Sequence, residues 1–155
     1  MCIRDRGRPF LDSISNADYA FPLAIVPLAL DKEPIWLAVF ALMAWSLAKH
    51  TYDAIQDIEE DEFVGIKTTA VYLGVKKSLI WVGFWWLVST IMFAFVNIPL
   101  AIANGAYAFW LIRLMIKDNS SANAKRIYKY SVAYPYVVGT VAGFQLVMFM
   151  ALELV

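Results

Sequence analysis

The chain has 155 residues, of which 61% are hydrophobic and 17% are charged, and its mean hydropathy is +0.62. Soluble domains are about 45–50% apolar and about 25% charged, so this composition excludes a soluble domain, a disordered tail and a basic nucleic-acid-binding domain. The single cysteine, Cys2, also excludes a disulfide scaffold and a Cys/His zinc cluster. We therefore predict an all-α, polytopic bundle of transmembrane helices, with membrane lipid and no nucleic acid as a partner.

The first six residues, Met-Cys-Ile-Arg-Asp-Arg, join poorly to the sequence that follows. They resemble a translated sequencing-adapter peptide, and the alternative interpretation is an ordinary short tail. We interpret residues 1–6 as a non-native N-terminal artefact and residues 7–155 as the credible domain, so no mechanistic role is assigned to Cys2.

Five apolar segments predict five membrane crossings. The first, Tyr19–Leu30, is short and contains two prolines, so we expect it to form a tilted or kinked crossing. The remaining four are long enough for ordinary spanning helices and cover Ile35–Ala48, Leu79–Val96, Ile98–Ile116 and Val132–Val155.

The charges of the connecting segments alternate along the chain. With a cytoplasmic N-terminus, 12 of the 13 Lys and Arg residues fall on the cytoplasmic side, and Lys32 is the exception. This is the positive-inside pattern, and four or six crossings would destroy it. We therefore expect an integral protein of a cytoplasmic membrane, with its acidic segment facing the cytoplasm.

That acidic segment, residues 53–62, directly follows the second apolar run and contains Asp53, Asp57 and Asp61 at four-residue spacing. On a helix these three carboxylates would share one face and repel each other, and acids near a helix C-terminus also oppose the helix dipole. A divalent cation would offset both effects, and Mg²⁺ prefers carboxylate, water and phosphate oxygens. We therefore predict Asp53, Asp57 and Asp61 as metal ligands that share a phosphate or diphosphate. The alternative is a solvated acidic loop.

The residues after the acidic segment extend this hypothesis. Gly65 is a plausible helix terminator. Lys67 is a candidate substrate-binding residue because its ammonium can contact phosphate oxygens, and the alternative is a topological positive-inside lysine. The glutamates Glu59, Glu60 and Glu62 lie off the shared face and are expected to be solvated.

The sequence from Asp57 to Gly74 resembles the second aspartate-rich motif of the UbiA superfamily of intramembrane prenyltransferases. Within that superfamily, the segment Arg8-Pro9-Phe10-Leu11-Asp12-Ser13 is similar to the lycopene elongase-like branch. The resemblance covers residues 7–155 and implies the C-terminal part of a nine-helix fold. In that fold two aspartate-rich motifs bind Mg²⁺ and a prenyl diphosphate.

This chain contains no Asn-Asp-x-x-Asp sequence and therefore lacks the first motif. We expect its functional partner to be the missing N-terminal half of the same protein, and we expect the chain alone to be inactive. The resemblance also implies that the source is a prokaryote.

The resemblance implies a Mg²⁺-dependent transfer of a prenyl group from an allylic diphosphate to a lipophilic acceptor such as lycopene. Asp57 and Asp61 would be catalytic, and Arg8 would bind the diphosphate. Aromatic faces could stabilise the allylic cation, and the candidates are Tyr52, Tyr72 and Tyr134. For Arg8 the alternative is a topological role, and for Tyr52 it is packing. His50 is expected to pack or to form a hydrogen bond.

Three alternatives to a carotenoid prenyltransferase remain open at this point. A UbiA-type transferase could act on an aromatic or quinone-precursor acceptor. A small membrane transporter or channel subunit could use the acids as a cation site. A structural scaffold would leave the spacing of the aspartates unexplained.

Overall fold

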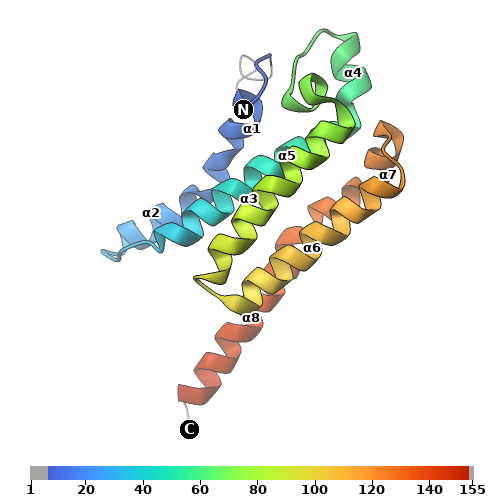
Figure 1. Ribbon diagram of the computed structural model, residues 1–155. Coiled ribbons are helices and arrows are strands. Elements are labelled where there is room, and N and C mark those ends of the chain that lie inside the picture. Colours follow the sequence, from blue (N-terminus) through green and yellow to red (C-terminus); the bar gives the residue numbers. More distant parts are fainter. Residues whose placement is uncertain (1–6, 154–155) are drawn as a thin grey trace.

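A computed structural model describes residues 7–153, and the segment interpreted as non-native, residues 1–6, lies outside them. All secondary-structure elements of the described part are helices (Figure 1). In chain order the elements are α1 (Leu11–Ile14), the 3₁₀ helix η1 (Ser15–Ala20), α2 (Phe21–Ala29), α3 (Trp36–Ala54), the 3₁₀ helix η2 (Ile55–Asp57), α4 (Ile58–Phe63), α5 (Thr69–Ala94), α6 (Ile98–Lys117), α7 (Ser121–Val132) and α8 (Tyr134–Glu153).

The order of helices and turns agrees with five crossings. In Figure 1 the α2–α3 and α5–α6 turns lie at one end of the bundle, and α4 and the α6–α7 turn lie at the other. Within residues 7–153, two helices combine the length and apolar composition needed to span a bilayer, namely α5 and α6. The first crossing is irregular as expected, because η1 leads directly into α2, which contains Pro27 inside the helix.

The core of the bundle lies where α3 packs against α5, and α5 in turn packs against α6. Small residues on α3, among them Ala41 and Ala48, are fully buried and allow the helix backbones to approach closely. Trp86 on α5 and Leu111 on α6 are almost fully buried and fill the space between the helices. Outward-facing residues such as Ile80 and Ile102 are exposed, which is the arrangement expected for helices that face lipid.

The helix that carries the aspartates is interrupted, and this differs from the expectation of one continuous face. After Ala54 the chain tightens into the 3₁₀ turn η2 before α4 begins at Ile58. A 3₁₀ turn has three residues per turn instead of 3.6, so the four-residue spacing no longer places the three aspartates in a straight row. Gly65, at φ 75°, ends α4, as the sequence indicated.

Candidate active site

Two neighbouring cavities open beside the acidic segment. The polar cavity has a volume of about 290 Å³ and is lined by His50, Asp53, Ala54, Gln56, Asp57, Asp61, Thr68 and Tyr128. The deep cavity has a volume of about 350 Å³ and is lined by Asn16, Tyr19, Trp45, Ser46, Lys49, His50, Asp53, Tyr128, Ser131, Val132 and Pro135. His50, Asp53 and Tyr128 belong to both walls, so the two cavities meet at these side chains.

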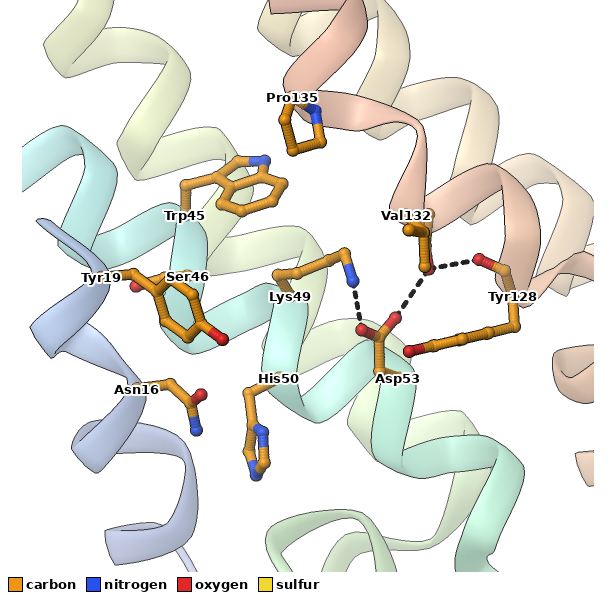
Figure 2. A pocket seen from close by; sticks show the side chains of 11 residues that line it. Asn16, Tyr19, Trp45, Ser46, Lys49, His50, Asp53, Tyr128, Val132 and Pro135 are labelled. Carbon is orange, nitrogen blue, oxygen red and sulfur yellow. Dashed lines mark hydrogen bonds and ion pairs between the residues drawn. The ribbon is translucent and has the colours of Figure 1, made fainter. Parts of the chain in front are cut away.

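The structure brings Asp53, Asp57 and Asp61 to the wall of the polar cavity, but in different states. Asp53 forms an ion pair with Lys49 (Figure 2). It also accepts a 2.7 Å hydrogen bond from the Ser131 hydroxyl on α7. Lys49 lies four residues before Asp53 on α3, so the two side chains share a helix face. Asp53 therefore already has a cationic partner on its own helix.

Asp57 has a different electrostatic environment. Burial, together with the negative charges of Asp61 and Glu60, raises the pKa of Asp57 above its ordinary value. Its carboxylate would therefore gain from a cation in the polar cavity. Asp61 lines the same cavity and accepts a 3.4 Å hydrogen bond from the Thr68 hydroxyl.

The donor set agrees with magnesium in its chemistry, although the side chains alone do not form a complete site. Among residues 7–153, no group of three or more His, Cys, Asp and Glu side chains is placed to hold a metal ion. Mg²⁺ is usually bound by one or two carboxylates, with waters and substrate phosphates completing its octahedron. Asp57 and Asp61 supply two such carboxylates, and phosphate oxygens would have to supply further ligands.

Glu59 and Glu60 are exposed, as is Glu62, which agrees with the expectation that these glutamates are solvated, and the first two also contact α7. Glu59 accepts a hydrogen bond from Ser121, and Glu60 forms an ion pair with Lys125; both partners lie on α7. These contacts fasten α7 to α4, and α7 in turn contributes Tyr128, Ser131 and Val132 to the deep cavity.

The structure does not bring three other predicted residues to these cavities. Tyr52 is buried away from them, where its hydroxyl donates a 3.0 Å hydrogen bond to the Leu111 carbonyl on α6 and its ring packs against Trp86. Arg8 and Lys67 are exposed, and neither lines the deep or the polar cavity. Tyr128 is the tyrosine that lines both cavities.

His50 forms part of both walls and faces a buried acid on its other side. Its Nε2 lies 3.7 Å from Oδ2 of Asp12, which is fully buried. Burial opposes the charged form of Asp12, but contacts with His50 and Thr69 outweigh it and hold the pKa of this carboxyl below its ordinary value. Sequence reasoning assigned no catalytic or binding role to Asp12, Thr68, Tyr128 or Ser131. For Lys49, the four-residue spacing to Asp53 was a readable signal.

The sequence of this chain is similar to those of known proteins. Residues 16–151 match the model of the UbiA prenyltransferase family. The chain is similar to a lycopene elongase/hydratase of Haloferax volcanii, with 32% identity over 141 residues, which cover 90% of this chain and 44% of the relative. A lycopene elongase/hydratase of Halobacterium salinarum is 36% identical over 118 residues, covering 74% of this chain and 43% of the relative.

A 4-hydroxybenzoate octaprenyltransferase of Chromohalobacter salexigens is also similar, with 30% identity over 105 residues that cover 66% of this chain and 34% of the relative. The chain thus spans less than half the length of these curated relatives. No solved structure matches the chain.

Proposed function

Because the chain belongs to the UbiA prenyltransferase family, we propose that it forms part of an enzyme that transfers a prenyl group to a lipophilic acceptor within a membrane. The observation that carries this proposal is the junction of a carboxylate-lined cavity with a more apolar one. An allylic diphosphate has the same two parts, a charged head and a hydrocarbon chain, so it matches the pair of cavities. A transporter or channel subunit would need polar groups along a path, whereas these acids gather at one end.

We assign the head of the donor to the polar cavity. Asp57 and Asp61 would hold Mg²⁺ together with the diphosphate, and the ion would neutralise the departing diphosphate as the allylic C–O bond breaks. The raised pKa of Asp57, caused first by burial and then by the charges of Asp61 and Glu60, supports this assignment because a bound cation would offset both effects. Asp53 is a weaker ligand candidate than the other two, since Lys49 and Ser131 already satisfy its carboxylate.

The hydrocarbon part would occupy the deep cavity. Trp45, Val132 and Pro135 supply apolar wall there, which would exclude water from the allylic cation until the acceptor double bond attacks it (Figure 2). The attack leaves a cation on the acceptor, which would lose a proton to the released diphosphate. The ring of Tyr128 lies at the junction of the cavities, where an aromatic face can stabilise a cation. We therefore prefer Tyr128 to Tyr52 for this role.

For the acceptor we propose a long polyene such as lycopene, and for the donor a C5 diphosphate. Relatives named lycopene elongase/hydratase support this choice. A physical argument supports it as well. An aromatic acid carries a carboxylate, which would need a cation to compensate for its desolvation. Lys49, the lysine of the deep wall, is already paired with Asp53.

An aromatic or quinone-precursor acceptor is the second candidate. The similarity to a 4-hydroxybenzoate octaprenyltransferase favours it. The N-terminal half of such an enzyme could also supply an unpaired basic residue to the deep cavity.

The test requires both halves of the fold. We suggest fusing the chain to the N-terminal half of the Haloferax volcanii relative, a hybrid called the completed enzyme below. It would be given lycopene and 4-hydroxybenzoate separately, each with C5 and longer prenyl diphosphates and with Mg²⁺. We expect C5 transfer to lycopene, and no transfer by the 155-residue chain alone. Transfer to the aromatic acid alone would overturn the carotenoid assignment, and no transfer to any acceptor would overturn the proposed function.

A further inference from the structure

The most completely buried acid of the described chain lies outside the aspartate-rich segment. Asp12 on α1 has no solvent exposure, and its carboxylate accepts two hydrogen bonds from Thr69, one from the backbone nitrogen at 2.9 Å and one from the hydroxyl at 2.5 Å. Asp12 and Thr69 are 57 positions apart in the sequence. A carboxylate buried in a bundle is costly unless it is fully paired, so this contact strongly restricts where Thr69 can lie.

Further hydrogen bonds hold the same threonine. The Thr69 hydroxyl accepts a 2.7 Å hydrogen bond from the backbone nitrogen of Phe10 and a 3.1 Å hydrogen bond from the Ser13 hydroxyl. Ser13 is itself 2.8 Å from the Thr51 hydroxyl on α3. The segment 10–13 therefore fixes the beginning of α5 against α3.

The residue next to Thr69 belongs to the polar cavity. Thr68 lines this cavity, caps the N-terminus of α5 by accepting a 3.3 Å hydrogen bond from the Val71 nitrogen, and donates its hydroxyl to Asp61 at 3.4 Å. Since Thr68 and Thr69 share one peptide bond, a carboxylate that fixes Thr69 also fixes the hydroxyl that contacts Asp61.

We propose that Asp12 is a positioning residue for the diphosphate site, which acts through Thr69 and Thr68 to hold Asp61 in the polar cavity. The proposal rests on the function proposed above, in which Asp61 binds the metal and diphosphate. Asp12 lines neither cavity, so it does not touch the substrate itself. Replacing Asp12 should therefore weaken the binding of metal and diphosphate and leave the binding of the acceptor unchanged.

The test uses the completed enzyme in lipid nanodiscs, with Mn²⁺ as a paramagnetic substitute for Mg²⁺ and inorganic pyrophosphate as the probe of the site. Mn²⁺ affinity would be measured by electron paramagnetic resonance, and prenyl transfer would be measured separately. For Asp12→Ala we expect the Mn²⁺ dissociation constant to rise at least about tenfold, the scale on which outer partners of metal ligands act. The KM of the donor should rise too, while the KM of the acceptor stays unchanged.

Two further variants separate positioning from a general loss of stability. Thr69→Val keeps the backbone contact with Asp12 and removes only the hydroxyl, so it tests the proposal if Asp12→Ala does not fold. Combining Asp12→Ala with Thr68→Val should weaken Mn²⁺ binding no more than the worse single change does, because both act through one contact with Asp61. Asp18→Ala is the matched control, since Asp18 is an exposed aspartate of the same N-terminal segment.

The outcomes distinguish this proposal from the proposed function. Unchanged Mn²⁺ affinity in both Asp12→Ala and Thr69→Val would overturn the role of Asp12, as would effects that multiply in the double variant. If the completed enzyme binds Mn²⁺ and pyrophosphate in an Asp12-dependent way but transfers no prenyl group, the positioning role stands and the proposed function fails. No Mn²⁺ binding by the unmodified enzyme would overturn both.

Discussion

The indole of Trp45 on α3 stacks on the phenol ring of Tyr134 on α8, with their ring centroids 3.7 Å apart and their planes inclined by 20°. Tyr134 is held in turn by its hydroxyl, which donates a 2.6 Å hydrogen bond to the side-chain oxygen of Asn104 on α6. Trp45 lines the deep cavity, at the end away from Asn16 in Figure 2. Because Tyr134 holds one face of the Trp45 indole, this indole forms a rigid wall of the cavity. Such a wall would limit the length of the hydrocarbon chain that the cavity accepts.

Replacing Trp45 with alanine should therefore change the preference for the donor. In the completed enzyme we expect the rate with C10 and C15 diphosphates, relative to C5, to rise at least about tenfold, because pocket size discriminates by about 1–3 kcal/mol per methylene. Trp36→Ala is the control, since Trp36 lies on the same helix, is 48% exposed and lines neither of the two cavities. An unchanged ratio would show that Trp45 does not set chain length.

The carboxylates of the polar cavity should be essential for turnover. Asp57→Asn or Asp61→Asn in the completed enzyme should each reduce prenyl transfer at least about 100-fold, the scale of losing one electrostatic contact to a transition state. Glu62→Gln, a change to an exposed acid of the same segment, should leave the rate nearly unchanged. Full activity in either aspartate variant would remove that residue from the metal site.

The orientation of the helices can be tested by labelling. The charge alternation predicts that Ser120, before α7, faces the cytoplasm and that Lys32, in the α2–α3 turn, faces the other side. Single cysteines introduced at these positions in a Cys2→Ser background should react with a membrane-impermeant maleimide from opposite sides. Labelling of both from the same side would mean that the number of crossings between them is wrong.

The close packing of α5 and α6 depends on Gly105. A Cβ atom built at this position would lie 2.9 Å from Cγ2 of Thr90, which is too close. We expect Gly105→Ala to destabilise the bundle by about 1–3 kcal/mol, measured by thermal unfolding in detergent.

Thr90→Ser provides a specific rescue of that variant. It removes the clashing methyl group and retains the hydroxyl, which would then be the nearest Thr90 atom, at 3.5 Å from the new Cβ. The double variant should recover most of the lost stability. Gly83→Ala is the control, because its Cβ would meet only an ordinary contact of 3.6 Å with Ile112. Equal losses for Gly105→Ala and Gly83→Ala would contradict this explanation.

Local patterns in the sequence predicted much of the fold. The family match and the helices confirm an all-helical membrane fold, because the length of an apolar run and the charge of its flanks are local properties. Glycine at the end of α4 was readable for the same reason, since a left-handed backbone favours it. The helical interruption at Ile55–Asp57 was not predicted, because these residues include no glycine or proline; the repulsion expected between aspartates on one helix face was the available signal.

The site was less predictable because its contacts are distant in sequence. The pairing of Asp12 with Thr69, and the approach of Tyr128 and Ser131 from α7, depend on how separate helices pack. Tyr52 illustrates the same point, because its position in the sequence did not reveal that it faces Leu111 on α6. The roles of Asp53, Asp57, Asp61, Arg8 and Lys67 stay predictions.

The hydrogen bonds that begin at Tyr134 have a consequence for the biogenesis of the protein. The side-chain oxygen of Asn104 accepts a hydrogen bond from the Tyr134 hydroxyl, and its side-chain nitrogen donates a 2.8 Å hydrogen bond to the Thr90 hydroxyl. The Thr90 hydroxyl in turn donates to the Trp86 carbonyl, so a chain of hydrogen bonds joins α8, α6 and α5. The Thr90 hydroxyl is satisfied within α5 itself, whereas the side chains of Asn104 and Tyr134 would be poorly satisfied if α6 or α8 entered lipid alone. Insertion of α6 is therefore favoured when α5 is already beside it, and α8 should dock last. The order of synthesis along the chain is thus also the order in which each polar group meets its partner.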